Sequence, residues 1–267
     1  MQPFGMNVIR VGVSVLLFWI LFLLNSPQKK IDRADVRRFI LCAFTGIAVN
    51  QMLFLKGLSL TYPIHAVLLM LTTPILITII AAWLLRERVN IYRIVGLGLG
   101  VSGAVVLITS GKNAGVGNHV LLGDLLILIN AVSYTFYFIL VKPLMLKYNP
   151  VQVLRWVFTF GLLMVVPFGW TEFIAINWEN YGPVEYGCIS LIVIGGTFLA
   201  YLFNVYGIKI LGASVAGAYI YIQPVFATII AMVFLKEQLE LYKIFAAALI
   251  FTGVYLSSRQ PAFLKVK

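Results

Sequence analysis

Uncharged amide side chains inside long apolar segments are the residues of this chain best suited to bind a polar molecule. Five amides stand deep within such segments: Asn50, Gln51, Asn130, Asn204 and Gln223. An amide that faces lipid is unfavourable, so each is expected to point toward other helices. There it either bonds to a neighbouring helix or contacts a bound molecule, and the sequence leaves both roles open.

Hydroxyl side chains extend this set of candidate binding residues. Thr72 stands two positions before a proline, where a helix frees backbone groups. Four tyrosines could line an amphipathic cavity wall, with hydroxyls that give specificity, or simply pack as aromatic residues: Tyr134, Tyr137, Tyr201 and Tyr219.

Two prolines are candidate hinges. Pro74 and Pro224 each remove one helical hydrogen bond and kink their helix. Their matched placement in two similar segments favours hinges beside a cavity, although transmembrane helices also tolerate proline without any function.

Catalytic and metal-binding patterns are missing from the sequence. No Asp or Glu is expected in the middle of a span, and Asp124 is the nearest, close to an outer end. His65 and His119 are expected to stand alone, and the cysteines, Cys42 and Cys188, to be buried apolar filler. We therefore predict no catalytic residues, no metal and no cofactor.

The composition predicts an all-α polytopic membrane protein. The chain is 61% hydrophobic and 11% charged, whereas soluble domains carry roughly a quarter charged residues. Its apolar residues come in blocks of about twenty, each long enough to cross a bilayer. We expect about nine transmembrane helices.

The net charge of +11 follows the positive-inside bias and does not indicate nucleic-acid binding. Alternate turns, beginning with the basic segment 29–38, hold most of the Lys and Arg. The basic residues expected on the outer side are Arg10, Lys56, Lys112, Lys236 and Lys243. This assignment places the C-terminus in the cytoplasm and the N-terminus of the chain outside, in a cell (inner) membrane.

A repeat organises the chain. Residues 57–107 align with residues 207–257 at a constant offset of 150 positions, so that Pro74 meets Pro224, Glu87 meets Glu237 and Gly103 meets Gly253. The two glutamates are expected to cap or pair at turns. Gly96 and Gly100 form a GxxxG spacing that allows close helix approach. We predict a first repeat at 1–111 with about four helices, an outer linker at 112–120, a second repeat at 121–258 with five helices, and a tail at 259–267.

This pattern resembles the drug/metabolite transporter superfamily, specifically its EamA-type members. The mid-helix proline, the glutamate thirteen residues on and the glycine-bearing helix occur twice, and Gly123-Asp124 with Ser133-Tyr134 is similar to the start of a second EamA unit. The resemblance implies two inverted five-helix repeats, ten spans, and alternating-access transport of small metabolites. Against that pattern we expect this chain to lack the first span.

We therefore predict a transporter of small metabolites, an exporter of amino acids or related compounds, that is not an enzyme. Its partners would be a small-molecule substrate and membrane lipid, with no nucleic acid, and the sequence leaves a homodimer open. Two alternatives remain: a non-transporting membrane subunit or scaffold, and a polytopic membrane enzyme.

Overall fold

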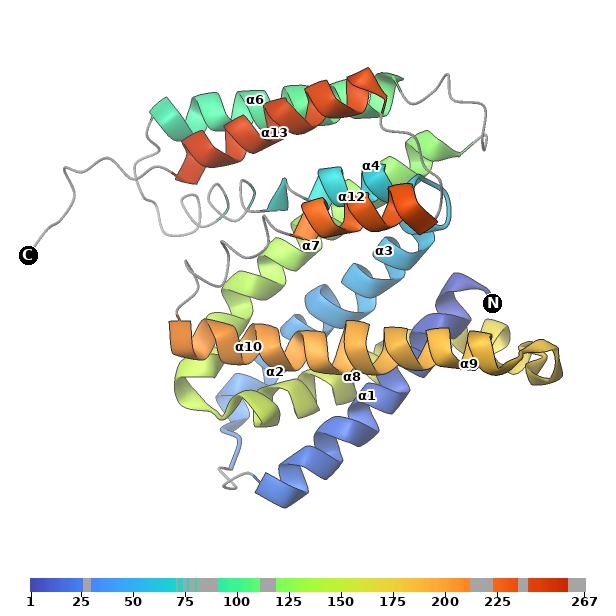
Figure 1. Cartoon of the computed structure of the whole chain (residues 1–267). Coiled ribbons are helices and arrows are strands. Elements are labelled where there is room, and N and C mark those ends of the chain that lie inside the picture. The colour runs from blue at the N-terminus through green and yellow to red at the C-terminus, as the bar shows by residue number, and fades with distance from the viewer. Residues whose placement is uncertain are drawn as a thin grey trace, which may run out of the picture. The chain divides into compact units, whose positions relative to one another are not determined.

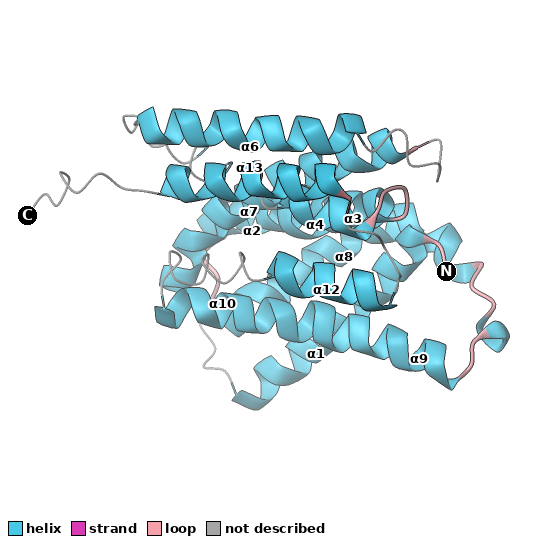
Figure 2. Cartoon of the chain, turned by 45° about the horizontal axis from the view of Figure 1, so that its top comes forward, coloured by secondary structure: helices cyan, strands magenta, loops and turns pink. Residues whose placement is uncertain are grey.

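The computed structural model describes residues 1–25, 30–70, 72–73, 76, 80, 91–110, 119–211, 223–234 and 240–258. Every regular element within these residues is helical (Figure 2). The elements are α1 (Pro3–Asn25), α2 (Arg33–Ala43), the π-helix η1 (Phe44–Val49), α3 (Asn50–Leu58), α4 (Pro63–Met70), α6 (Ile91–Ser110), α7 (Val120–Lys147), α8 (Pro150–Ile174), the short 3₁₀ turn η3 (Trp178–Asn180), α9 (Pro183–Ser190), the π-helix η4 (Leu191–Leu199), α10 (Ala200–Leu211), α12 (Gln223–Phe234) and α13 (Leu241–Ser258).

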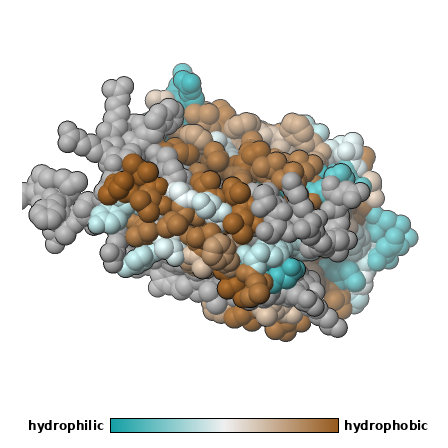
Figure 3. All heavy atoms as spheres, turned by 90° about the horizontal axis from the view of Figure 1, so that it is seen from above, coloured by the Kyte–Doolittle hydropathy of each residue, from teal (hydrophilic) through white to brown (hydrophobic). Residues whose placement is uncertain are grey.

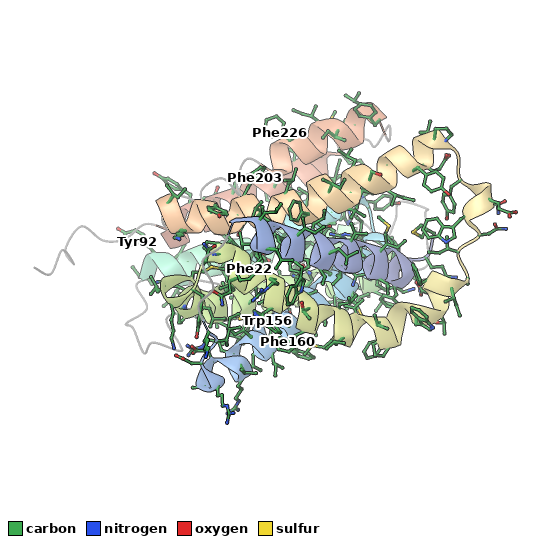
Figure 4. All side chains as sticks on the ribbon, turned by 90° about the horizontal axis from the view of Figure 1, so that it is seen from below. Phe22, Tyr92, Trp156, Phe160, Phe203 and Phe226 are labelled. Atoms are coloured by element: carbon green, nitrogen blue, oxygen red, sulfur yellow. The ribbon has the colours of Figure 1, made fainter. Side chains whose placement is uncertain are left out.

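Several of these helices are long and apolar enough to cross a membrane. Five spans meet both criteria within the described residues: Pro3–Leu24, Arg33–Leu58, Val120–Lys147, Pro150–Ile174 and Pro183–Gly207. Large apolar side chains such as Phe203 and Phe226 remain exposed (Figure 4), and the face seen in Figure 3 is largely hydrophobic. Such a surface suits lipid rather than water. The prediction of an all-α polytopic membrane protein is confirmed.

The described helices form two compact units that cut across the two sequence repeats. Unit 1 comprises Met1–Lys56 and Phe136–Ala218, and unit 2 comprises Gly57–Thr135 and Tyr219–Lys267. Helices α3 and α7 continue from one unit into the other. Each unit therefore combines segments from both halves of the sequence.

In unit 1, α1 packs antiparallel along α8. Gly5 lies against Glu172, Gly12 against Leu162, and the Phe18 ring packs at a tilt against the Phe158 ring with centroids 5.0 Å apart. The start of α1 is capped from α8, because Glu172 Oε2 accepts hydrogen bonds from the backbone N–H groups of Phe4 at 2.7 Å and Gly5 at 2.9 Å. A carboxylate at a helix N-terminus accepts hydrogen bonds from the free backbone N–H groups, and its negative charge interacts favourably with the positive end of the helix dipole.

In unit 2, α6 and α13 lie side by side (Figure 1) and also run antiparallel. A Cβ added at Gly253 would come 2.5 Å from the Gly96 carbonyl oxygen and 2.7 Å from the Gly100 nitrogen. A Cβ at Gly103 would meet Ile250 instead. The prediction that the GxxxG spacing allows close helix approach is confirmed. Since α6 and α13 are equivalent at the 150-residue offset, their antiparallel packing is the one expected of inverted repeats.

Charged groups join the start of α2 to the end of α7 in unit 1. Lys147 Nζ lies 2.6 Å from Asp35 Oδ2 and also pairs with Asp32. The Tyr148 hydroxyl donates to Asp35 Oδ2 at 2.6 Å. Burial, followed by this bond to Asp35, raises the pKa of the Tyr148 hydroxyl, so Tyr148 stays a donor.

The two cysteines have different surroundings. Cys42 is buried on α2, as expected, whereas Cys188 on α9 is exposed, so the prediction of a buried Cys188 is wrong. Both thiols are free. The sequence misled because α9 presents apolar residues outward, and lipid-facing and core-facing positions have similar hydropathy.

Candidate functional site

A row of buried polar side chains on α1 forms the centre of the candidate site in unit 1. Asn7, Arg10 and Ser14 are spaced three and four residues apart, so they share one face of the helix. Asn7 and Ser14 are 0% exposed and Arg10 is 9% exposed. This face packs against α8 and η4.

Arg10 carries a positive charge into this interior. Its Nε donates to Thr197 Oγ1 at 2.9 Å, and Thr197 is itself fully buried on η4. Among the described residues, no acidic side chain forms an ion pair with Arg10. A buried cation without an anionic partner is strongly unfavourable, so this position is expected to serve a function.

Gln51 and Tyr201 extend the polar site from α3 and α10. Gln51 Nε2 donates to the Tyr201 hydroxyl at 3.3 Å, and that hydroxyl donates to the Gly46 carbonyl at 3.1 Å. Tyr201 follows Thr197 by four residues, so both side chains project from neighbouring turns. The ring of Tyr137 packs against Gly46, where a Cβ would leave no room for it.

The two π-helices explain how backbone groups reach this site. η1 supplies the Gly46 carbonyl, and η4 supplies Thr197, whose hydroxyl also bonds the Ile192 carbonyl at 3.1 Å. π-helical turns disturb the regular hydrogen-bond ladder and are frequent at functional sites. At the 150-residue offset η1 falls within η4, and Gln51 falls on Tyr201. Equivalent positions of the two repeats thus touch one another in unit 1.

Several polar atoms of the site lack a hydrogen-bond partner among the described residues. These are both amide atoms of Asn7, Oγ of Ser14 and Oε1 of Gln51. A buried polar atom without a partner costs about 1–3 kcal/mol, so such atoms normally meet water or a ligand. Asn7 and Ser14 flank Arg10 on α1, so this is a candidate place for a small polar molecule.

A second buried arginine lies farther along the same helix pair. The Arg155 guanidinium carbon is 3.5 Å from the ring centroid of Phe22 and 4.4 Å from that of Trp19. Trp156 lies 5.1 Å away, and Figure 4 shows Phe22 and Trp156 near each other where α1 meets α8. Aromatic faces stabilise a cation through their quadrupoles. Arg155 is thereby stabilised within the protein, unlike Arg10.

The other predicted site residues lie in several places. In unit 1, Asn50 is buried on α3 and Asn204 half-buried on α10. In unit 2, Asn130 is buried and Tyr134 half-buried on α7, and the Thr72 hydroxyl donates to the Leu69 carbonyl at 2.7 Å. Pro74 and Tyr219, together with Glu87 and Glu237, lie outside the described residues. Gln223 and Pro224 begin α12, but their side chains lie outside the described part as well.

Two charged residues have surroundings that differ from the expectation. Arg10, which is expected among the outer basic residues, is buried inside unit 1. His65 was expected to stand alone, yet its Nδ1 lies 3.2 Å from Asp124 Oδ2 in unit 2. Sequence could have indicated Arg10, because Asn7, Arg10 and Ser14 form a polar stripe within an otherwise apolar helix. Thr197, the partner of Arg10, and Asp124, the partner of His65, are far away in the chain. No pattern in the sequence indicated these two pairings.

Known proteins resemble this chain over most of its length. The model of the EamA-like transporter family matches twice, at residues 1–109 and 121–259. An uncharacterized transporter, YetK of Bacillus subtilis (strain 168), is 25% identical over 252 residues, covering 93% of this chain and 76% of that protein. A probable terminal-alkyne amino-acid exporter of Streptantibioticus cattleyicolor is 28% identical over 231 residues, covering 85% and 74%.

The fold also has a counterpart among solved structures. One crystal structure superposes with a TM-score of 0.63 and covers 97% of this chain and 88% of its own. Its sequence is 19% identical, so the likeness concerns the fold alone.

Proposed function

Because this chain belongs to the EamA-like transporter family, we propose that it exports small carboxylate-bearing metabolites, amino acids or related compounds, by alternating access. The chain is a multi-pass membrane transporter. In the proposal it resides in the cell (inner) membrane with its C-terminus in the cytoplasm, and its two repeats have inverted orientations.

The observation that carries the proposal is the buried Arg10 guanidinium. Thr197 satisfies one of its N–H groups but supplies no negative charge. A carboxylate would neutralise a single guanidinium and accept two parallel hydrogen bonds from it. A phosphate group brings about two negative charges, which one arginine leaves partly uncompensated. The site therefore favours a monoanionic carboxylate.

The remaining polar atoms of the site suit the other groups of an amino acid. The Asn7 and Gln51 side-chain oxygens, both without a partner in the described part of the chain, are acceptors for an ammonium group. The Asn7 amide nitrogen, which also has no partner among the described residues, offers a donor. The Streptantibioticus relative bears the name of an amino-acid exporter, which supports this substrate class and the direction of transport.

The Gln51–Tyr201 contact suits a moving element in the same cycle. Both residues occupy equivalent positions of the two repeats, so they lie where the repeats meet within unit 1. A single neutral hydrogen bond contributes only about 0.5–1.5 kcal/mol, so it can break and re-form as the repeats rock against one another. In this scheme Pro74 and Pro224 act as hinges.

An efflux assay with purified full-length protein tests the proposal. Proteoliposomes are loaded with a mixture of radiolabelled amino acids, and efflux is followed for the wild type, Arg10→Met, Arg10→Lys and Arg37→Met. We expect Arg10→Met to lose about ten- to a hundredfold in rate, since a hydrogen bond to a charged group contributes about 1.5–3 kcal/mol. Arg10→Lys should keep part of the activity.

The matched control is Arg37→Met, which removes an exposed arginine from α2 and should transport normally. Equal amounts of each variant must be present in the vesicles. Wild-type efflux that persists in Arg10→Met would refute the role of Arg10, and the absence of efflux for every amino acid would refute the substrate class.

A further inference from the structure

A second polar cluster lies in unit 2, where the ends of four helices meet. His65 is the third residue of α4, Asp124 the fifth of α7 and Tyr242 the second of α13. Thr61 stands in the turn between α3 and α4. We call these four residues the helix-end cluster. Its position near helix termini indicates a site close to one face of the membrane.

Hydrogen bonds connect all four members of the cluster. The Thr61 hydroxyl donates to Asp124 Oδ1, while Asp124 Oδ2 lies 3.2 Å from His65 Nδ1. The other ring nitrogen, His65 Nε2, lies 3.3 Å from the Tyr242 hydroxyl. His65 and Asp124 are both 0% exposed, whereas Thr61 and Tyr242 are half-buried. The buried pair therefore lies between two half-buried side chains, Thr61 next to Asp124 and Tyr242 next to His65.

Two glycines allow this close approach. A Cβ at Gly123 would come 2.9 Å from the Gly57 carbonyl oxygen and 2.9 Å from the Thr61 Cβ. The backbones of α3 and α7 therefore touch one residue before Asp124. This contact holds the carboxylate beside the turn that carries Thr61, and it explains why Gly123-Asp124 stands at the start of α7.

Other titratable groups surround the cluster on the same elements. The Lys243 ammonium lies 5.3 Å from the Tyr62 ring centroid and 5.9 Å from that of Tyr242. Titratable residues also stand at the adjoining helix ends: Lys56 on α3, His119 ahead of α7 and Glu240 ahead of α13. Of the helices that pack on α4, α12 has no titratable residue in its described range, and α6 carries Tyr92 and Arg93 at its far end.

We propose that His65 and Asp124 form a proton-binding site through which a proton gradient drives transport. In the neutral state Nδ1–H of His65 donates to Asp124, and Nε2 accepts from the Tyr242 hydroxyl. A proton that arrives at Nε2 reverses this second bond, so that Nε2–H donates to the Tyr242 oxygen. The new imidazolium then forms an ion pair with the Asp124 carboxylate.

The chemistry of the pair suits a coupling ion at physiological pH. Imidazole is the side chain that ordinarily changes its charge between pH 5 and 8, and a neighbouring carboxylate stabilises the charged form. Binding or release of the proton changes the hydrogen bonds between α4, α7 and α13, so it can bias the packing of these helices. The proposal rests on transport activity but not on the identity of the substrate.

A magnetic-resonance titration tests proton binding directly. The chain contains two histidines, so His119→Gln leaves His65 as the single histidine of the full-length protein in lipid nanodiscs. With isotope-labelled histidine, we expect the ring resonances of His65 to titrate reversibly between pH 5 and 9. In Asp124→Asn this response to pH should change, because the carboxylate that pairs with the imidazolium is gone. Resonances that stay fixed over this range would overturn the proposal.

A proton gradient tests the coupling in the proteoliposomes described above. An inwardly directed gradient should accelerate efflux of the labelled amino-acid mixture from vesicles with wild type or His119→Gln. His65→Gln and Asp124→Asn should lose this acceleration while still exchanging substrate without a gradient. Acceleration that survives in both variants would overturn the coupling. If no amino acid is moved at all, the proposed substrate class fails, and the titration alone decides the proton site.

Discussion

The contact between α6 and α13 allows a quantitative prediction, because Gly253 leaves no room for a larger residue. A Cβ at this position would lie 2.5 Å from the Gly96 carbonyl oxygen, about 0.9 Å less than the 3.4 Å at which ordinary contact begins. The obstacle is backbone on a neighbouring helix, so no side-chain rotation relieves it. In Gly253→Ala the two helices must move apart along the contact.

The expected loss of stability follows from that overlap. Inserting one methyl group into a well-packed contact costs about 1–3 kcal/mol. At roughly 2–4 °C per kcal/mol for a chain of this size, the melting temperature of the purified protein should fall by roughly 2–12 °C. The matched control is Gly98→Ala on α6, where a Cβ meets nothing within 4 Å. There alanine should leave the stability unchanged or raise it slightly through helix propensity.

Thermal unfolding of both variants in the same detergent measures the difference. Equal melting temperatures for Gly253→Ala and Gly98→Ala would refute the close packing of α6 on α13. They would also refute the idea that the GxxxG spacing of Gly96 and Gly100 serves to bring these helices together.

Two further predictions concern the N-terminal cap and the orientation of the chain. Glu172→Gln should reduce stability by about 1 kcal/mol, measured by the same unfolding assay, because an amide opposes the dipole at the start of α1 less well than a carboxylate. Glu179→Gln changes an exposed carboxylate and should have no effect, so equal losses would contradict the capping role. A reporter fused after Lys267 should read cytoplasmic, and one inserted within 112–119 should read external. Reporters on the same side would contradict the inverted topology.

Part of the candidate site could be foreseen from the sequence. Gln51 and Tyr201 were both candidates because a polar side chain in an apolar helix must face the protein interior. Their direct hydrogen bond could not be foreseen, since hydropathy says which residues face inward but not which ones meet. The burial of Arg10 could not be foreseen for a related reason: the positive-inside bias counts arginines on each side of the membrane and does not say that α1 buries this one against η4.

The sequence by itself determined that the chain is a helical membrane protein built from two repeats. Hydropathy and the 150-residue offset suffice for that conclusion, because the bilayer fixes helix length and the repeat fixes helix order. Only the tertiary structure decided that each compact unit combines both repeats and that Arg10 meets Thr197 while His65 meets Asp124. These contacts join residues 187 and 59 positions apart, so they depend on how the helices pack and not on any local pattern.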